Sequence, residues 1–194
     1  NRYFSNNTYF RTYVFKKLDL WNVCAFVILI MIIDGKKEAA VLREAIKKEI
    51  SSLKGKTNRV PGLTVILIGD FAPSQIYVRN KEKNSKEVGI NSNVIKYATD
   101  VTEKEVLKKI KELNNDKDVS GILVQLPLPD QISKEKIINS IDPSKDVDGF
   151  NPVNVGNLAS GNHAIVPCTP LGCLLLLKKI EKNLSGKHAV IIGR

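Results

Sequence analysis

The chain has 194 residues, of which 43% are apolar, which is enough for one domain with a hydrophobic core and part of a second. Its 30 lysine and arginine residues against 20 acidic residues give a net charge of +10, but they are scattered lysines without interleaved aromatic side chains, so a nucleic-acid-binding module is the weakest interpretation. Cys24, Cys168 and Cys173 form no C-x-x-C pair and only His163 and His188 could join them, which argues against a zinc site and a disulfide framework.

Residues 1–30 differ in composition from the rest of the chain. They hold most of its aromatic residues, and Met31, its one methionine, follows them directly. The apolar run 23–33 comes after Arg11 and two lysines, a feature of organelle-targeting segments, but no cleavage site of small residues follows it and it is too short to cross a membrane. We therefore expect residues 1–30 to be an extension outside the fold, with organelle targeting as the alternative.

From Met31 onward, segments with helical spacing of apolar residues alternate with short, continuous apolar runs. In chain order we predict a helix at 36–53, a strand at 63–68, a helix at 74–88, a strand at 92–98, a helix at 102–114, a strand at 121–125, a helix at 133–140, a helix from 169 and a strand at 188–194. Alternation of this kind indicates a parallel sheet with helices on both faces, so the predicted fold class is three-layer α/β.

Capping residues set the ends of several of these helices. Ser74 is expected to be an N-cap and Gly89 a C-terminal stop for the helix between them. Thr102 and Glu105 have the spacing of a capping box. Thr169 is expected to cap the last helix, because a proline follows it at the first helical position.

Two domains are predicted. Gly, Asn and Pro concentrate over 150–167, so we expect a first domain at 31–150, followed by a linker and the start of a second domain at 151–194. The second domain begins with an apolar run that ends at Gly193, as a Rossmann dinucleotide-binding unit does. The rest of that fingerprint would follow Arg194, so we expect the chain to stop just inside this domain.

Several polar residues are predicted to meet at one edge of the sheet. The helix after the first strand offers Tyr77 and Lys81, which lie one turn apart on the same face. Gln125 stands at the end of a buried apolar strand, and Asp146 and Asp148 follow in a loop. Because ligands bind beyond the carboxyl ends of parallel strands, a lysine, a tyrosine, an amide and a carboxylate should converge on one crevice.

Each of these residues, taken alone, also has an ordinary structural interpretation. A helix lysine such as Lys81 is usually solvated, Tyr77 can be a half-buried packing residue, and Asp148 before a glycine can build a turn. Gln125 is harder to explain in this way, because a buried amide needs hydrogen-bond partners. The last two cysteines are expected to be small core residues. The convergence, more than any single residue, therefore indicates a site.

Four ordered motifs resemble a single family. They are "PSQIYVRNKEK", "GILVQLPLP", "PSKDVDGFNPVNVG" and "VPCTPLG", and together they are similar to the bifunctional methylenetetrahydrofolate dehydrogenase/methenyltetrahydrofolate cyclohydrolase family of bacterial and organellar type. The likeness runs from about Met31 to Arg194. It implies a catalytic domain and a Rossmann domain for NADP, with a folate cleft between them.

The resemblance implies a role for each candidate in the first domain. Lys81 matches the catalytic lysine, Gln125 its partner, Tyr77 the stacking tyrosine, and Asp148 and Pro127 folate-binding positions. The chemistry suits these roles, because one carboxylate can accept two hydrogen bonds from a pterin edge and a tyrosine can stack on a flat ring. A lysine amine can act as a base only in its neutral form.

Further implications concern the cofactor and the reaction. Cys168 and Thr169, at a helix N-terminus, and Gly193 and Arg194, at the start of the cofactor loop, are implied to bind NADP, and no metal is implied. The implied reaction is NADP-dependent oxidation of 5,10-methylenetetrahydrofolate to the methenyl form, followed by its hydrolysis to 10-formyltetrahydrofolate. We expect the 194-residue chain to lack both activities at normal rates.

The implied partners are tetrahydrofolate derivatives, with or without a polyglutamate tail, and a second copy of the chain in a homodimer, with no nucleic acid or membrane. The implied location is the cytoplasm. Two alternatives remain open: a family member with only the dehydrogenase activity that uses NAD, and a non-catalytic folate-binding fragment.

Overall fold

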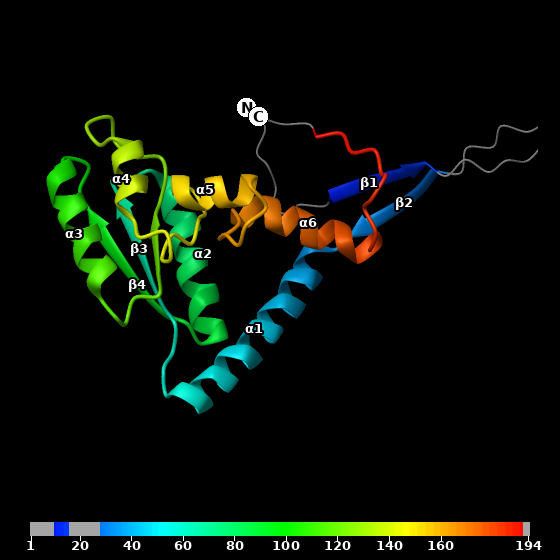
Figure 1. Cartoon of the computed structure of the whole chain (residues 1–194), viewed down its shortest axis with the longest axis horizontal. Coiled ribbons are helices and arrows are strands. Elements are labelled where there is room, and N and C mark those ends of the chain that lie inside the picture. Colours follow the sequence, from blue (N-terminus) through cyan, green and yellow to red (C-terminus); the bar gives the residue numbers. More distant parts are fainter. Residues whose placement is uncertain (1–9, 16–27, 192–194) are drawn as a thin grey trace, which may run out of the picture. The chain divides into compact units, whose positions relative to one another are not determined.

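The structure is a computed structural model that describes residues 10–15 and 28–191 (Figure 1). The chain divides into two compact units, one of residues 43–172 and one of residues 1–42 with 173–194. The elements in chain order are β1 (Phe10–Phe15), β2 (Ile28–Ile33), α1 (Gly35–Thr57), β3 (Gly62–Ile68), α2 (Ala72–Val88), β4 (Asn91–Tyr97), α3 (Glu103–Asn115), β5 (Gly121–Val124), α4 (Lys134–Ser140), α5 (Pro152–Ala159) and α6 (Cys168–Ile180).

The 43–172 unit is built on a parallel sheet with the strand order β4-β3-β5. In the central strand, β3, the apolar residues from Val65 to Ile68 are buried, whereas β4 lies at an edge and is half exposed. An isolated parallel bridge between Ile122 and Asp146 extends the pairing beyond β5. The predicted parallel α/β fold is confirmed.

Two apolar clusters separate the layers of this unit. On one face of the sheet, Ile66 and Ile122 pack with Ile110 of α3 and Ile137 of α4, and all four are fully buried. On the other face, Val65 and Leu123 pack with Val78 of α2. The side chains of a strand alternate between its faces, so neighbouring residues of β3 and β5 serve opposite clusters. Figure 1 shows α2 and α3 on opposite sides of the sheet.

Helix ends follow the predicted capping chemistry in some places and depart from it in others. Thr102 and Glu105 form the expected capping box, and Gly89 ends α2 in the left-handed conformation with φ 91°. Ser74 is not an N-cap, because α2 begins at Ala72 and Ser74 is buried inside it. Thr169 is not an N-cap either, since α6 begins at Cys168.

Two further predictions about elements need correction. Helix α5 follows the cap Asn151 and has Pro152 in its first turn, yet it was not predicted, because the stretch reads as a Gly-, Asn- and Pro-rich linker. The strand predicted at 188–194 is wrong over its described part: residues 188–191 form no strand, and the Ile191 side chain is 93% exposed. An apolar run becomes a strand only where a neighbouring strand can accept its backbone hydrogen bonds.

The second unit contains an antiparallel pair of strands, in which Phe10 of β1 lies opposite Ile33 of β2. Most of the predicted 1–30 extension lies outside the described residues. In the same unit, Lys179 of α6 forms an ion pair with Glu38 of α1 at 2.9 Å. Among the described helices, none is long and apolar enough to cross a membrane.

Candidate active site

The structure brings Lys81 of α2 together with Gln125, the residue that follows β5. The Lys81 Nζ donates a hydrogen bond to Gln125 Oε1 at 3.0 Å. The amide Nε2 of Gln125 donates to the carbonyl oxygen of Leu126 at 2.8 Å, and its backbone N–H donates to Ile66 O at 2.9 Å. Because the amide nitrogen is already engaged, the amide oxygen is turned toward the lysine amine.

Ser74 ties α2 to the same loop. Its hydroxyl donates to Leu126 O at 3.3 Å, so this carbonyl accepts from both Ser74 and Gln125. Ser74 is 3% exposed and lies two turns before Lys81 on the buried side of α2. Sequence reasoning missed this contact, because a serine after a proline reads as a cap. Pro127, the predicted folate-binding proline, follows Leu126 and is exposed.

Asp148 lies in the loop between Asp146, which pairs with Ile122 of β5, and helix α5. It is close enough to Lys81 for the two charges to interact. The pKa of the Asp148 carboxyl is raised above its ordinary value, chiefly by burial; the Lys81 ammonium opposes this shift and the Asp146 carboxylate adds to it. The structure therefore places a partly desolvated carboxylate beside the Lys81–Gln125 pair. A carboxylate in such a position retains hydrogen-bonding capacity for a ligand.

Asp146 does not join this group, although the sequence placed it in the same crevice. Its side chain is 2% exposed and accepts hydrogen bonds from the Asn151 backbone N–H at 2.8 Å and from Asn154 Nδ2 at 3.0 Å. A buried carboxylate needs such donors, and α5 supplies them. Sequence reasoning missed both asparagines, whose signal was their close spacing after the "DVDG" turn.

The remaining candidates are exposed or lie outside the described residues. The Tyr77 side chain is 62% exposed, one turn before Lys81. Cys168 and Thr169 are exposed in the first turn of α6, and Cys173 is exposed as well, so the prediction of core cysteines is wrong. The Cys168 Sγ lies 3.6 Å from Val147 O. Although the residue as a whole is exposed, partial burial of its sulfur atom, with Asp148 nearby, raises the pKa of the thiol against the opposing effect of Lys81.

Gly193 and Arg194, the predicted start of the cofactor loop, lie outside the described residues. In the part of the chain whose side chains are described, no group of three His, Cys, Asp or Glu residues is placed to hold a metal ion.

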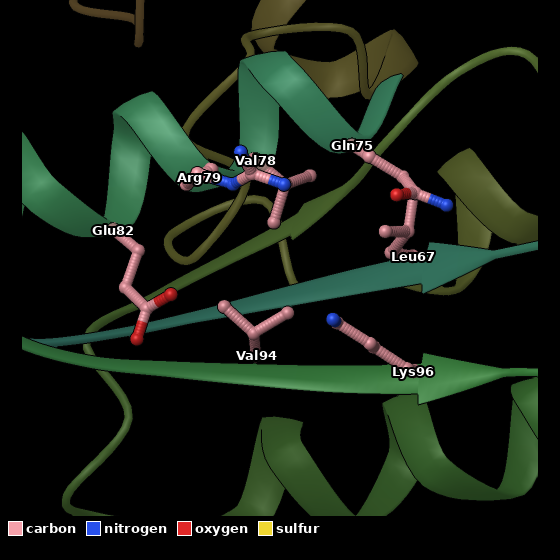
Figure 2. A pocket seen from close by; sticks show the side chains of 7 residues that line it. All are labelled: Leu67, Gln75, Val78, Arg79, Glu82, Val94 and Lys96. Atoms are coloured by element: carbon pink, nitrogen blue, oxygen red, sulfur yellow. The ribbon is translucent and has the colours of Figure 1, made fainter. Parts of the chain in front are cut away.

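A separate pocket lies on the opposite flank of α2. Figure 2 shows Gln75, Arg79 and Glu82 of this helix above Leu67 of β3 and Val94 and Lys96 of β4. None of the predicted site residues lines it. The side chains over the edge strand β4 therefore form a different environment from the Lys81–Gln125 pair over β5.

Comparison with known proteins shows similarity over most of the chain. Residues 33–148 match the family described as "Tetrahydrofolate dehydrogenase/cyclohydrolase, catalytic domain". The chain is 65% identical over 164 residues to the bifunctional protein FolD of Pelagibacter ubique, covering 84% of this chain and 58% of that protein. It is 52% identical over 167 residues to the same-named protein of Rhodospirillum rubrum, covering 84% of this chain and 56% of the relative.

Solved structures show the same similarity. The bifunctional FolD dehydrogenase/cyclohydrolase of Campylobacter jejuni superimposes with a TM-score of 0.80 at 49% identity, covering 84% of this chain and 57% of that one. The Trypanosoma brucei enzyme, solved with NADP and an inhibitor, gives a TM-score of 0.76 at 34% identity, covering 80% of this chain and 53% of that one. The chain thus spans a little over half the length of these relatives.

Proposed function

The chain belongs to the tetrahydrofolate dehydrogenase/cyclohydrolase family, and we propose that it supplies the folate-binding and proton-transfer part of a bifunctional enzyme. The proposed reactions are oxidation of 5,10-methylenetetrahydrofolate to the methenyl form with NADP, and hydrolysis of that product to 10-formyltetrahydrofolate. The observation that carries the proposal is the hydrogen bond of 3.0 Å from Lys81 Nζ to Gln125 Oε1, with the Asp148 carboxylate beside it.

Asp148 is proposed to recognise the pterin ring. The pterin edge presents a ring N–H beside an amino group, and a single carboxylate can accept both hydrogen bonds at once. Asp148 is suited to this because its environment is partly desolvated, which strengthens a charge-assisted hydrogen bond. Tyr77, with 62% of its side chain exposed, is free to stack on a flat ring of the substrate, and the exposed Pro127 is proposed to line the same cleft.

Lys81 is proposed to move the proton in the hydrolysis. The water that attacks the methenyl carbon must lose a proton, and only the neutral form of a lysine amine can accept one. Gln125 holds the amine through its carbonyl oxygen, and its own NH₂ group is held by Leu126 O. The amide partner therefore orients the lysine amine through a neutral hydrogen bond.

NADP is proposed as the cofactor, and its nicotinamide would accept the hydride in the oxidation step. Cys168 and Thr169, exposed in the first turn of α6, are proposed to contact it, together with Gly193 and Arg194. Residues 31–150 are proposed as the catalytic domain and 151–194 as the linker and start of the cofactor domain.

The protein is further proposed to be cytoplasmic, to act on folates with or without a polyglutamate tail and to form a homodimer. The position of β4 at an edge of the described sheet supports the homodimer, because an edge strand can pair with a second copy.

The experiment that tests the proposal is calorimetric titration of the purified chain with tetrahydrofolate under reducing conditions. We expect binding, and we expect Asp148→Asn to weaken it about 10- to 100-fold, because a hydrogen bond to a charged group contributes about 1.5–3 kcal/mol. Glu82→Gln makes the same change of charge on the opposite flank of α2 and should leave the affinity unchanged. The proposal fails if the chain does not bind tetrahydrofolate, or if both variants bind it equally well.

A further inference from the structure

The loop that carries Asp148 is held in place by residues outside the candidate site. The backbone N–H of Gly149 donates to Asp146 O at 3.1 Å, which closes a turn around Val147 and Asp148. Ile122 N–H donates to Lys145 O at 2.7 Å and pairs with Asp146, so the first end of the turn is fixed in register with β5. Because Gln125 follows the same strand, this register also sets the spacing between Asp148 and the Lys81–Gln125 pair.

Asn154 of α5 also holds the first end of the turn, at Asp146, and connects it to the segment around Ile165. Its Nδ2 donates to Asp146 Oδ2 at 3.0 Å and to Pro143 O at 2.9 Å, and its Oδ1 accepts from Ile165 N at 3.4 Å. All the polar atoms of the side chain are therefore engaged, and the residue is 5% exposed. An aspartate here would lose both donors and place a second carboxylate against the buried Asp146.

The segment that Asn154 reaches, at Ile165, also packs against the turn itself. A Cβ added to Gly149, which has φ 66°, would lie 2.5 Å from Ile165 O and 3.0 Å from Pro167 N. The Cys168 Sγ approaches Val147 O at 3.6 Å. The residues on both sides of Asp148 thus contact 165–168, and Asn154 connects that segment to the buried Asp146.

We infer that Asn154 is a positioning residue that, through Asp146 and Ile165, sets where the Asp148 carboxylate stands in the folate site. The inference rests on the proposed function for the identity of the ligand. The placement of the loop, in contrast, is a property of the protein without ligand. One measurement without folate and one with folate therefore test the inference separately from the proposed function.

The measurement without folate is a carbon-13 NMR pH titration of the Asp148 carboxyl, assigned by its loss in Asp148→Asn. In the wild-type chain the pKa of this carboxyl should lie above the ordinary aspartate value, as burial dictates. In Asn154→Ala the turn loses the hydrogen bonds of Asn154 and the loop should become more solvated. The pKa of the Asp148 carboxyl should then move down toward the ordinary aspartate value. Asn157→Ala is the matched control, because Asn157 lies on the same helix and its side chain makes no hydrogen bond within the described residues. An unchanged titration in Asn154→Ala overturns the inference.

The measurement with folate is a double-mutant cycle on tetrahydrofolate affinity. Asn154→Ala alone should weaken binding roughly 10-fold, within the loss that a misplacement of about 1 Å can cause. In the Asp148→Asn background, the same substitution should have almost no further effect, because its action passes through Asp148. Additive effects of the two substitutions would show that Asn154 acts elsewhere and would overturn the inference.

Folding is monitored throughout by circular dichroism, and Asn154→Ser, which keeps one hydroxyl donor and acceptor, provides a milder variant. It should show a smaller change in both measurements than Asn154→Ala. If both variants fail to fold, Asn154 is a structural residue and the inference is wrong. If the wild-type chain does not bind tetrahydrofolate, the proposed function fails, and the NMR titration alone decides whether Asn154 positions Asp148.

Discussion

The two flanks of α2 carry similar side chains in different surroundings. On the flank toward β5, Lys81 donates to the neutral amide of Gln125, and in the described part of the chain it forms no ion pair. On the flank toward β4, Glu82 pairs with Lys86 at 2.6 Å, and this contact, with the charge of Lys96 farther off, lowers the pKa of the Glu82 carboxyl. Figure 2 shows the Glu82 and Lys96 side chains on this flank.

The difference shows why a hollow lined by charged residues is not by itself a functional site. Over β4 the carboxylate of Glu82 is already neutralised by lysines of its own surface, and solvated pairs of this kind contribute little free energy. Over β5 the lysine is paired with an amide, and the nearby carboxylate of Asp148 is partly desolvated. Polar groups that the protein does not tie up in salt bridges remain available to a ligand, and that is the property a catalytic site requires.

The largest expected difference between the two flanks of α2 is in the effect of a substitution on hydrolysis of 5,10-methenyltetrahydrofolate, a reaction that needs no nicotinamide. Lys81→Met keeps the aliphatic part of the side chain and removes the amine. We expect any hydrolysis by the chain above the buffer rate to fall by roughly 100-fold, or to the buffer rate, the usual scale for a lost general base. The decrease in absorbance of 5,10-methenyltetrahydrofolate over time measures the rate of hydrolysis.

Arg79→Met is the matched control for this prediction, because it removes a cation from the opposite flank of the same helix. Its rate should stay within about twofold of the wild-type rate, since Arg79 lies away from the proposed proton transfer. If Lys81→Met hydrolyses the substrate as fast as Arg79→Met does, Lys81 is only a solvated helix lysine.

A smaller effect is expected at Tyr77. Tyr77→Ala should weaken tetrahydrofolate binding about 3- to 10-fold, because stacking of aromatic rings contributes roughly 0.5–1.5 kcal/mol beyond area burial, whereas Tyr77→Phe should keep most of the affinity. Ile76→Ala is the control. Ile76 is 56% exposed, similar to Tyr77 at 62%, but the two side chains point in different directions from α2. Equal losses for Ile76→Ala and Tyr77→Ala would contradict a stacking role.

The smallest expected effect is on stability and depends on pH. Burial raises the pKa of Asp148 in the folded state, so the folded protein holds this proton more tightly than the unfolded chain does. The resulting stabilisation is complete at pH values below the pKa of Asp148 in the unfolded chain. It is lost as the pH rises through the pKa of Asp148 in the folded protein. At neutral pH, Asp148→Asn should therefore raise the thermal midpoint by roughly 1–4 °C.

Thermal unfolding followed by circular dichroism at several pH values checks this prediction. The gain from Asp148→Asn should shrink as the pH falls below the ordinary aspartate value, because the wild-type carboxyl is then protonated in both states. Glu82→Gln should behave oppositely, since the pKa of Glu82 is lowered and its removal costs stability at neutral pH. A lower midpoint for Asp148→Asn at neutral pH would show that the carboxylate is satisfied in the folded protein.

The alternation of elements in the 43–172 unit could be predicted from the sequence because it depends on local patterns. The unbroken apolar run of β3 is buried as its composition predicts, and Thr102 with Glu105 makes its capping box within four residues. The same reasoning predicts that Lys81, Gln125 and Asp148 lie near one another, since ligand sites form beyond the carboxyl ends of parallel strands, and the hydrogen bond from Lys81 to Gln125 agrees with that expectation.

Other features could be decided only by the tertiary structure, because they depend on which side chains the fold brings into contact. Ser74 has the local signature of a cap, but in the folded protein its hydroxyl reaches Leu126, which is 52 residues away. Asp146 and Asp148 are equivalent in sequence, yet Asn151 and Asn154 bind one while the other lies beside Lys81. Which of two neighbouring carboxylates is structural depends on which one faces the donors of Asn151 and Asn154, and the spacing of these asparagines in the sequence does not decide that.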